Sequence, residues 1–448
     1  MKEFSYRKIL SITGPLMFGT FIQSIVTFTD AIFISELGEI SIGAFGNGSL
    51  MYIAFFMFCR GLSDGAQIMI ARYEGEKNYP LIGETVFHTK VYQLLISAII
   101  FSIILIFGQS IIYGIANSNL IAAEMYDFIR FRGIGLFFAA QYLTLVAFLI
   151  GIGRTNLILI SAVIIAITNI FLDYVLVFGH FGFPELKLIG APIASSIAEI
   201  VGFIVLYVAI KYAKNFNKYA IFVKHKLNYK KYIPLLQLSI PLMFQGVLSL
   251  STWLVFFTLI EHKGTAELEA SLNIKYIYFL AFVPIFGFAA STKTIISNLV
   301  GQGKQHLIIK AQFKIILLSV IFILFFFHGA VLYPEVLVRM VNQNPNIGEN
   351  TLNNSVEILK FVSGSILLYS VVVVLYNTIA GLGKTRISFW IEAMGILCYL
   401  TACYLFIVRW DWNIRDVWTV EYVYFSSLGL FSIIYLIYYK FKKLNYET

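Results

Sequence analysis

Long apolar segments alternate with short polar ones along the whole chain, and each apolar segment has about the length of a membrane-spanning helix. A helix needs about 20 apolar residues to cross a bilayer, and the apolar–polar alternation typical of membrane strands does not occur. The pattern therefore predicts an all-α polytopic membrane protein with twelve transmembrane helices. We expect these helices at residues 8–34, 43–71, 91–116, 125–150, 157–179, 190–212, 233–260, 268–298, 311–333, 354–380, 387–409 and 418–439.

The composition supports this fold class and excludes two others. Of the 448 residues, 59% are hydrophobic and 13% are charged, against about 25% charged in typical soluble domains. A soluble protein would lack the polar surface that it needs, and a disordered chain would be far less hydrophobic. The net charge of +9 does not indicate a nucleic-acid partner, because membrane proteins collect positive charge in cytoplasmic loops. The three cysteines form no CxxC pair, so neither a disulfide framework nor a thiolate zinc site is expected.

The distribution of lysine and arginine among the loops predicts the orientation in the membrane. Cations gather in every second loop and near both termini, most densely in the run from Lys211 to Lys231. By the positive-inside rule, these loops and both termini are expected in the cytoplasm. The prediction is a multi-pass protein of the inner (plasma) membrane whose basic run faces lipid headgroups. The first apolar segment is expected to be retained as helix 1, because no signal-peptide cleavage site follows it.

An internal repeat divides the chain into two halves. Residues 15–18 and 241–244 both have the sequence PLMF, an offset of 226. The segment GIGRTN at 151–156 corresponds to GLGKTR at 381–386, an offset of 230. Each half holds six predicted helices, so both halves enter the membrane from the same side and form a parallel repeat.

The repeat predicts the domain organisation and a class of function. We expect an N-lobe of residues 1–213, a cytoplasmic linker of 214–231 and a C-lobe of 232–448, with two pseudo-symmetric six-helix bundles around a central cleft. This architecture is typical of secondary transporters. The pattern GxxxxGK[ST] is missing, so an ion gradient rather than ATP is the expected energy source. The GxG turns are expected to cap helices, and without an HExxH or GxSxG motif we expect no enzyme activity.

Two predicted helices of the first half carry carboxylates, which cost about 2.5–3.5 kcal/mol each inside a membrane. Asp30 lies in helix 1, two turns after Gln23, and Asn169 and Asp173 lie one turn apart on helix 5. The two acids fall at similar depth. They can share a proton, because a low-dielectric site disfavours two adjacent negative charges, or they can bind a sodium ion through oxygen ligands. The alternative is a hydrogen-bonded network that only orients helices 1 and 5. The second half has no acids at the matching positions.

Other charged residues lie within the predicted spans. Lys293 and Glu392 can pair with each other, line the cleft or contact substrate, and Arg60 is a further candidate cleft charge that Asp64, four residues later, can neutralise. Carboxylates and aromatic faces in a cleft would attract cationic substrates. Because aromatic residues also serve as core and interface residues, the 17% aromatic content identifies no individual contact.

These residues resemble the multidrug and toxic compound extrusion (MATE) transporters of the MOP superfamily over nearly the whole chain. The resemblance is carried by Pro15, Gln23 and Asp30 in helix 1, by the GxG[KR]T turns and, most specifically, by NIFLDYVLVFG followed by FGFPELKLIGAPIAS. The ARxxG end of helix 2 also matches.

The resemblance implies a monomeric antiporter that exports small amphiphilic organic cations in exchange for H⁺ or Na⁺ by alternating access, with no cofactor besides the coupling ion. It also implies an N-lobe ion site in which Asp30 and Asp173 are the carboxylates, with Asn169 and Gln23 as polar partners. The Ala191 carbonyl and the Ser195 hydroxyl would complete the site. Some relatives carry a second carboxylate site in helices 7, 8 and 10. Here helix 8 contains Lys293, which favours coupling through the N-lobe.

Two other functions are compatible with parts of the sequence. A lipid-linked oligosaccharide flippase of related architecture would place basic residues opposite a pyrophosphate, and Arg60, Lys275 and Lys293 are candidates for that role. A membrane-embedded transferase would need a His/Asp or metal-binding Asp constellation near a membrane face, and the sequence contains none that we recognise.

Overall fold

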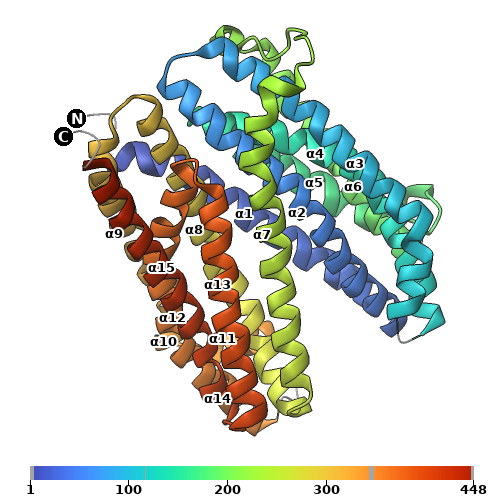
Figure 1. The fold of residues 1–448 in the computed structure, drawn as a ribbon. Helices are drawn as coiled ribbons and strands as arrows, with labels where there is room; N and C mark the ends of the chain where they lie inside the picture. The colour runs from blue at the N-terminus through green and yellow to red at the C-terminus, as the bar shows by residue number, and fades with distance from the viewer. Residues whose placement is uncertain (1–4, 117, 343–347, 445–448) are drawn as a thin grey trace. The chain divides into compact units, whose positions relative to one another are not determined.

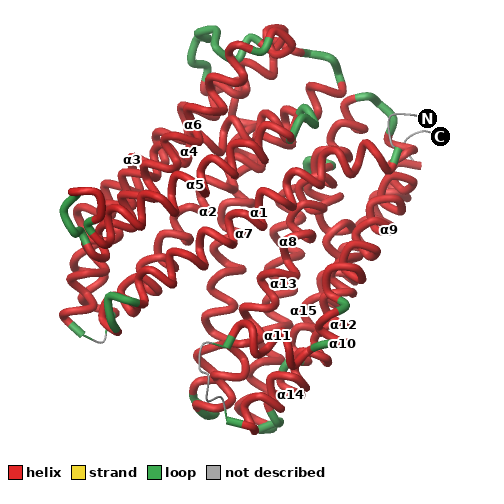
Figure 2. Tube along the Cα trace, turned by 180° about the vertical axis from the view of Figure 1, so that it is seen from behind, coloured by secondary structure: helices red, strands yellow, loops and turns green. Residues whose placement is uncertain are grey.

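The computed structural model describes residues 5–116, 118–342 and 348–444, and within these ranges it contains helices and loops without a strand (Figures 1 and 2). Twelve of the described helical segments are long and apolar enough to cross a membrane. The prediction of an all-α protein with twelve transmembrane helices is confirmed.

The first half contains six long helices. They are α1 (Tyr6–Ser35), α2 (Glu39–Gly75), α3 (Tyr79–Ile115), α4 (Asn119–Gly151), α5 (Asn156–Phe178) and α6 (Gly190–Tyr212), with the short helices η2 (His180–Gly182), η3 (Lys187–Ile189) and η4 (Lys214–Tyr219) between and after them. The largest difference from the predicted bounds is in α3, which begins at Tyr79 rather than residue 91. Its first three turns include polar residues such as Glu84 and Lys90. Pro80 is favourable in the first turn, because the backbone N–H that proline lacks would have no helical acceptor there.

The second half repeats this order with more interruptions. Its elements are α7 (Tyr229–Glu261), α8 (Thr265–Gly301), η5 (Gln305–Leu307), α9 (Ile308–Phe327), α10 (Gly329–Leu332), α11 (Pro334–Val341), α12 (Glu349–Gly381), α13 (Thr385–Cys403), η6 (Tyr404–Arg409), α14 (Ile414–Val417) and α15 (Thr419–Leu444). The predicted helix 311–333 is interrupted after α9, and the predicted helix 387–409 ends in the π-helical turn η6.

Contacts group the residues into two compact units. The N-terminal unit comprises residues 14–246, and the C-terminal unit comprises residues 1–13 and 247–448. The division falls inside α1 and α7, so the linker packs with the N-terminal unit. Within the N-terminal unit α4 contacts α2, α3 and α6, and within the C-terminal unit the equivalent fourth long helix, α12, contacts α8, α9 and α15 (Figure 1).

The two GxG turns that mark the repeat adopt the same structure. Gly153 follows α4 with φ at 68°, and Gly383 follows α12 with φ at 79°. Glycine adopts this left-handed conformation without the steric penalty of a side chain. The amides of Gly153 and Gly383 donate to Ile150 O at 2.9 Å and Ala380 O at 2.8 Å. The turns therefore cap helices, as predicted.

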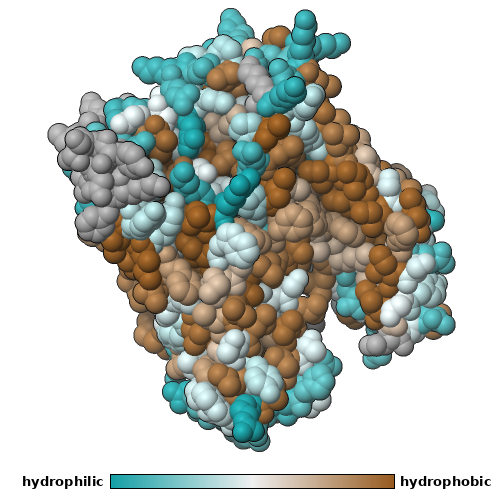
Figure 3. All heavy atoms as spheres, in the orientation of Figure 1, coloured by the Kyte–Doolittle hydropathy of each residue, from teal (hydrophilic) through white to brown (hydrophobic). Residues whose placement is uncertain are grey.

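The surface is that of a membrane protein. Hydrophobic side chains cover the middle of the helices, whereas hydrophilic ones gather at helix ends (Figure 3). Large side chains such as Ile106, Phe107 and Phe325 are more than half exposed. Apolar patches of this extent are a liability in water and suit contact with lipid, so the chain is a multi-pass membrane protein.

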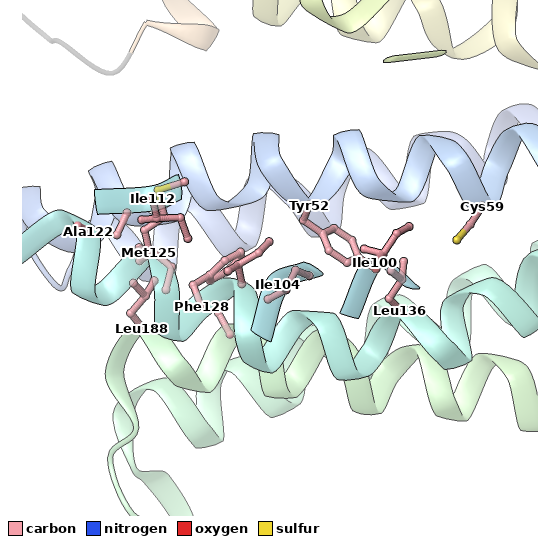
Figure 4. Close-up of a cluster of buried hydrophobic side chains, with 14 of the residues drawn as sticks. Tyr52, Cys59, Ile100, Ile104, Ile112, Ala122, Met125, Phe128, Leu136 and Leu188 are labelled. Atoms are coloured by element: carbon pink, nitrogen blue, oxygen red, sulfur yellow. The ribbon is translucent and has the colours of Figure 1, made fainter. Parts of the chain in front are cut away.

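The apolar core of the N-terminal unit lies among α2, α3 and α4. Figure 4 shows buried side chains from these helices, including Tyr52 and Cys59 of α2, Ile104 of α3 and Phe128 and Leu136 of α4. Phe128 fits against Gly48 of α2, where a Cβ atom would lie 2.7 Å from the ring. This packing holds α4 close to α2.

A small-residue motif brings α2 against α7 within the N-terminal unit. A Cβ atom on Gly61 would lie 2.4 Å from the backbone of Met243, and one on Gly65 would lie 2.1 Å from Ser239 Oγ. Small residues four apart allow two membrane helices to approach closely. The single hydroxyl proton of Ser239 is shared between Leu235 O of its own helix at 2.8 Å and Leu62 O of α2 at 3.3 Å, so packing is the main part of the contact.

The linker docks on the ends of α2 and α3. Tyr219 is buried and its hydroxyl donates to Glu74 Oε1 at 3.2 Å. Burial, and then the charge of Glu74, raise the pKa of the Tyr219 hydroxyl, so it remains a donor. The ring of His88 stacks on Tyr232 with 3.6 Å between centroids. A Cβ atom on Gly83 would lie 2.3 Å from the Tyr219 carbonyl oxygen, so only glycine fits at this contact.

Gly83→Ala is expected to loosen the linker. The new methyl group would push the Tyr219 backbone away from α3, so trypsin should cleave the lysine-rich linker several-fold faster than in the wild type, measured by gel densitometry in detergent micelles. Gly114→Ala is the matched control, because a Cβ atom at Gly114 of the same helix meets nothing within 4 Å. Equal cleavage rates in the two variants would contradict the proposed role of Gly83.

Candidate acidic cation site in the N-terminal unit

The structure brings the two predicted aspartates together. Asp30 projects from α1 and is half-buried, and Asp173 projects from α5 and is fully buried. The two carboxyl groups are neighbours that interact with one another. We call these two residues the acidic pair. Its members come from helices that are far apart in sequence.

The acidic pair is rich in acceptor atoms. Asp30 Oδ1, both carboxylate oxygens of Asp173 and Asn169 Oδ1 are buried and receive no hydrogen bond from the part of the chain that the structure describes. A buried acceptor without a donor costs about 1–3 kcal/mol, and more when it is charged. A hydrogen bond between two carboxyl groups requires a proton, and two carboxylates otherwise require a cation. The pair therefore suits a proton or a hard cation that prefers oxygen ligands.

Asn169 and Ser195 join the pair through α5 and α6. Asn169 lies one turn before Asp173 on α5, and its Nδ2 donates to Ser195 Oγ at 3.2 Å. The close approach of the two helices depends on Gly190, where a Cβ atom would lie 2.8 Å from the backbone of Leu176. The predicted partners Asn169 and Ser195 thus lie at the candidate site.

Two other predicted partners lie apart from it. Gln23 is exposed on α1, and among the described contacts none links its side chain to the acidic pair. Ala191 is buried with the apolar core at the start of α6, and no described contact brings its carbonyl oxygen to the pair. The roles of Gln23 and Ala191 remain predictions.

An ion pair that the sequence analysis did not identify joins α4 to α6 in the same unit. Arg132 of α4 donates to Glu199 of α6 through Nη1 at 2.7 Å and Nη2 at 2.6 Å. The sequence feature that could have indicated this ion pair is the presence of opposite charges within two apolar helices. The spacing gave no indication that Arg132 and Glu199 face each other, because they belong to different helices.

The three candidate cleft charges take different positions. Arg60 is exposed on α2 of the N-terminal unit. In the C-terminal unit, Lys293 of α8 and Glu392 of α13 are both buried. Glu392 accepts hydrogen bonds from the hydroxyls of Ser249 at 2.7 Å and Tyr424 at 2.5 Å. The three alternatives for Lys293 and Glu392, pairing with each other, lining the cleft or contacting substrate, remain predictions.

The donor set limits the cation that the site can hold. Among the described residues, no three His, Cys, Asp or Glu side chains gather as a metal-binding group. The acidic pair offers carboxylate oxygens with a neighbouring amide and hydroxyl. Such ligands suit H⁺ or Na⁺ rather than a soft metal.

The family model described as MatE matches the chain twice, over residues 15–175 and 241–405. The two matches start 226 residues apart and end 230 residues apart. These offsets equal those of the internal repeat found in the sequence.

Curated relatives extend the similarity to nearly the full length. The probable multidrug resistance protein NorM of Synechocystis sp. is 26% identical over 444 residues, covering 96% of this chain and 93% of the relative. A second relative of the same description, from Rhizobium meliloti, is 23% identical over 316 residues, covering 70% of this chain and 68% of the relative.

Solved structures share the fold. A multidrug resistance MATE family transporter of the MOP superfamily, in an outward-facing conformation, superposes with a TM-score of 0.89 at 16% identity, covering 96% of this chain and 94% of the other. A MATE structure in complex with MaD3S gives a TM-score of 0.87 at 17% identity, covering 98% and 96%.

Proposed function

The chain belongs to the MatE family of multidrug and toxic compound extrusion transporters, and from this premise we propose that it is a secondary antiporter that exports small amphiphilic organic cations in exchange for H⁺ or Na⁺. The observation that carries the ion-coupling part is the acidic pair. Its buried oxygens have no donor among the described residues, and a carboxylate inside a membrane-spanning helix marks a functional site by default.

The coupling ion acts by changing the charge of the acidic pair. In the outward-facing state, H⁺ or Na⁺ enters from outside and binds between Asp30 and Asp173. The loss of repulsion lets α1 repack, with bending near Pro15, where a proline inside α1 removes a backbone hydrogen bond. Substrate then loses affinity and leaves, and the ion dissociates to the cytoplasm after the transporter returns to the inward-facing state.

The remaining parts of the proposal follow from the sequence and the relatives. The two relatives are named as probable multidrug resistance proteins, which supports drugs as the substrate class. The basic loops support a plasma-membrane protein with both termini in the cytoplasm. We further propose that the transporter works as a monomer surrounded by lipid, with no cofactor besides the ion.

The test is transport by purified protein in proteoliposomes, with the proton and sodium gradients imposed separately. Ethidium should move against its gradient when one of the two ion gradients is imposed, and should not do so when both are absent. Ethidium movement that is independent of both gradients would overturn antiport. Translocation of a lipid-linked oligosaccharide without ethidium transport would instead favour the flippase.

A further inference from the structure

His88 of α3 contacts the linker through a ring whose two nitrogens have different partners. Its Nδ1 lies 2.8 Å from the carbonyl oxygen of Glu84, and the backbone N–H of Asn228 in the linker donates to its Nε2 at 3.2 Å. A carbonyl oxygen accepts hydrogen bonds and a backbone N–H donates them. Nδ1 therefore carries the proton and Nε2 is bare, so the two bonds together require the neutral ring.

The same ring supports the first turn of α7. It stacks on the Tyr232 ring with 3.6 Å between the centroids and 16° between the planes, and the Tyr232 hydroxyl donates to Glu84 Oε2 at 2.6 Å. His88 is 2% exposed and Tyr232 is 1% exposed, so water does not replace a hydrogen bond that the ring loses. We call His88, Glu84, Asn228 and Tyr232 the linker contact.

A proton on Nε2 is incompatible with the linker contact. The new N–H of His88 would point at the backbone N–H of Asn228, so two donors would face each other without an acceptor between them. A buried charged group that lacks a hydrogen-bond partner is strongly unfavourable. The ring can therefore take up a proton on Nε2 only after Asn228 has moved away and water has reached the ring.

The titratable and charged groups near the linker contact come from four elements. They are Glu84 and Lys90 of α3, Tyr73 of α2, His225 of the linker and Tyr232 of α7. Of these, Glu84 would favour a charged ring and Lys90 would oppose one. Neither alters the requirement for a bare Nε2, because that nitrogen faces the N–H of Asn228.

His225 is the second histidine of this region. Its ring lies 5.8 Å from the ring of Phe87, which in turn lies 5.4 Å from the ring of His88. His225 Nε2 is buried and has no hydrogen-bond partner among the described residues. A proton on His225 would therefore break no described hydrogen bond at Nε2, whereas a proton on His88 breaks the bond to Asn228.

We propose that His88 makes the docking of the linker pH-dependent, so that the linker is held while the ring is neutral and is released when Nε2 takes up a proton. Asn228 directly precedes α7, so acidification on the linker side of the membrane acts on the start of that helix. This regulation is independent of the proposed function, because it concerns how the linker is held and not which ion or substrate is transported.

The direction of the pH dependence follows from the protons bound by each form. The docked form carries no proton on Nε2, whereas the released ring binds one with the pKa of a free histidine, about 6.5. Docking is therefore fully stable above that pH and is weakened as the pH falls below it. Between pH 7.5 and pH 5.5 the equilibrium constant for docking should fall about ten-fold.

A histidine that serves only to fill space makes a different prediction. If the linker could leave while the ring stayed buried against Tyr232, no proton would be taken up on release. The docking of Asn228 would then be equally strong at both pH values, and replacement of His88 would change its strength without changing its pH dependence.

The experiment measures hydrogen–deuterium exchange in the purified full-length protein in micelles. Mass spectrometry follows peptides that contain Asn228 at pH 7.5 and pH 5.5, because the exchange of a hydrogen-bonded amide reports local opening. Each rate is divided by that of the same peptide in the unfolded chain, which removes the direct effect of pH on exchange. Protection in the wild type should fall about ten-fold at the lower pH.

Two variants assign the pH dependence to one histidine. In His88→Gln the protection should be the same at both pH values, because glutamine does not titrate. His225→Gln is the matched control and should keep the ten-fold decrease of the wild type. Equal protection of the wild type at the two pH values would overturn the proposal, and so would a ten-fold decrease that persists in His88→Gln.

His225→Gln also decides the question if His88→Gln does not insert into the membrane. With the second histidine of the region removed, a retained ten-fold decrease in the protection of Asn228 supports the role of His88. Loss of the decrease in His225→Gln would assign the effect to His225 and would contradict the proposal.

Discussion

Asp30→Asn is expected to abolish export almost completely while the protein still inserts into the membrane. Asparagine keeps the size of the side chain but cannot carry a charge, so the remaining carboxyl group of Asp173 no longer binds and releases the cation as half of a pair. The measurement is ethidium efflux from cells, normalised to the amount of protein in the membrane. Asp173→Asn should give the same result, because the two carboxyl groups are neighbours that interact with one another.

The matched control is Asp127→Asn. Asp127 lies in α4 of the same unit, 41% of its side chain is exposed, and it pairs with Arg130 at 3.3 Å. An exposed ion pair contributes about 0–1 kcal/mol, so efflux should stay at the wild-type level. Full export by Asp30→Asn, or an equal loss in Asp127→Asn, would contradict the assignment of the acidic pair.

Gly61→Ala is expected to cause a large loss of stability. The added Cβ atom would lie 2.4 Å from the Met243 backbone, a distance at which α2 and α7 must separate. Overpacking of this kind costs about 1–3 kcal/mol, and here the neighbour is backbone that cannot rotate away. The measurement is the midpoint of thermal unfolding in detergent, which should fall by several degrees.

Gly46→Ala, on the same helix, is the matched control and is expected not to lower stability. A Cβ atom at Gly46 meets nothing within 4 Å, and alanine is favoured over glycine in a helix by about 0.5–1 kcal/mol. Its unfolding midpoint should stay the same or rise slightly. A decrease in Gly46→Ala as large as that in Gly61→Ala would show that the α2–α7 contact is not the cause.

The sequence predicts the helices well, because hydrophobicity alone determines which segments enter a membrane. The predicted bounds differ where polar turns continue a helix beyond the apolar segment, as at Tyr79–Lys90 of α3. The PLMF repeat and the GxG turns also predicted the internal repeat correctly. The turns are recognisable in both halves because Gly153 and Gly383 have a positive φ, which few residue types other than glycine adopt.

The candidate site was predicted only in part. Asp30 and Asp173 could be identified because an acidic residue within an apolar helix is costly and therefore marks a candidate functional site. The partners of these residues depend on how each helix is rotated about its axis, which weak amphipathicity does not fix. The sequence therefore did not reveal that Arg132 of α4 pairs with Glu199 of α6, or that the hydroxyls of Ser249 and Tyr424 donate to Glu392.

The most direct test of the account measures which ion is released when substrate binds. Ethidium is added to purified protein in weakly buffered micelles, and the released H⁺ or Na⁺ is measured with a pH electrode or a sodium-sensitive dye. The wild type should release one of the two ions on binding ethidium, and the Asp30→Asn/Asp173→Asn variant should release neither. An undiminished ion release from the double variant would contradict the claim that the acidic pair holds the coupling cation.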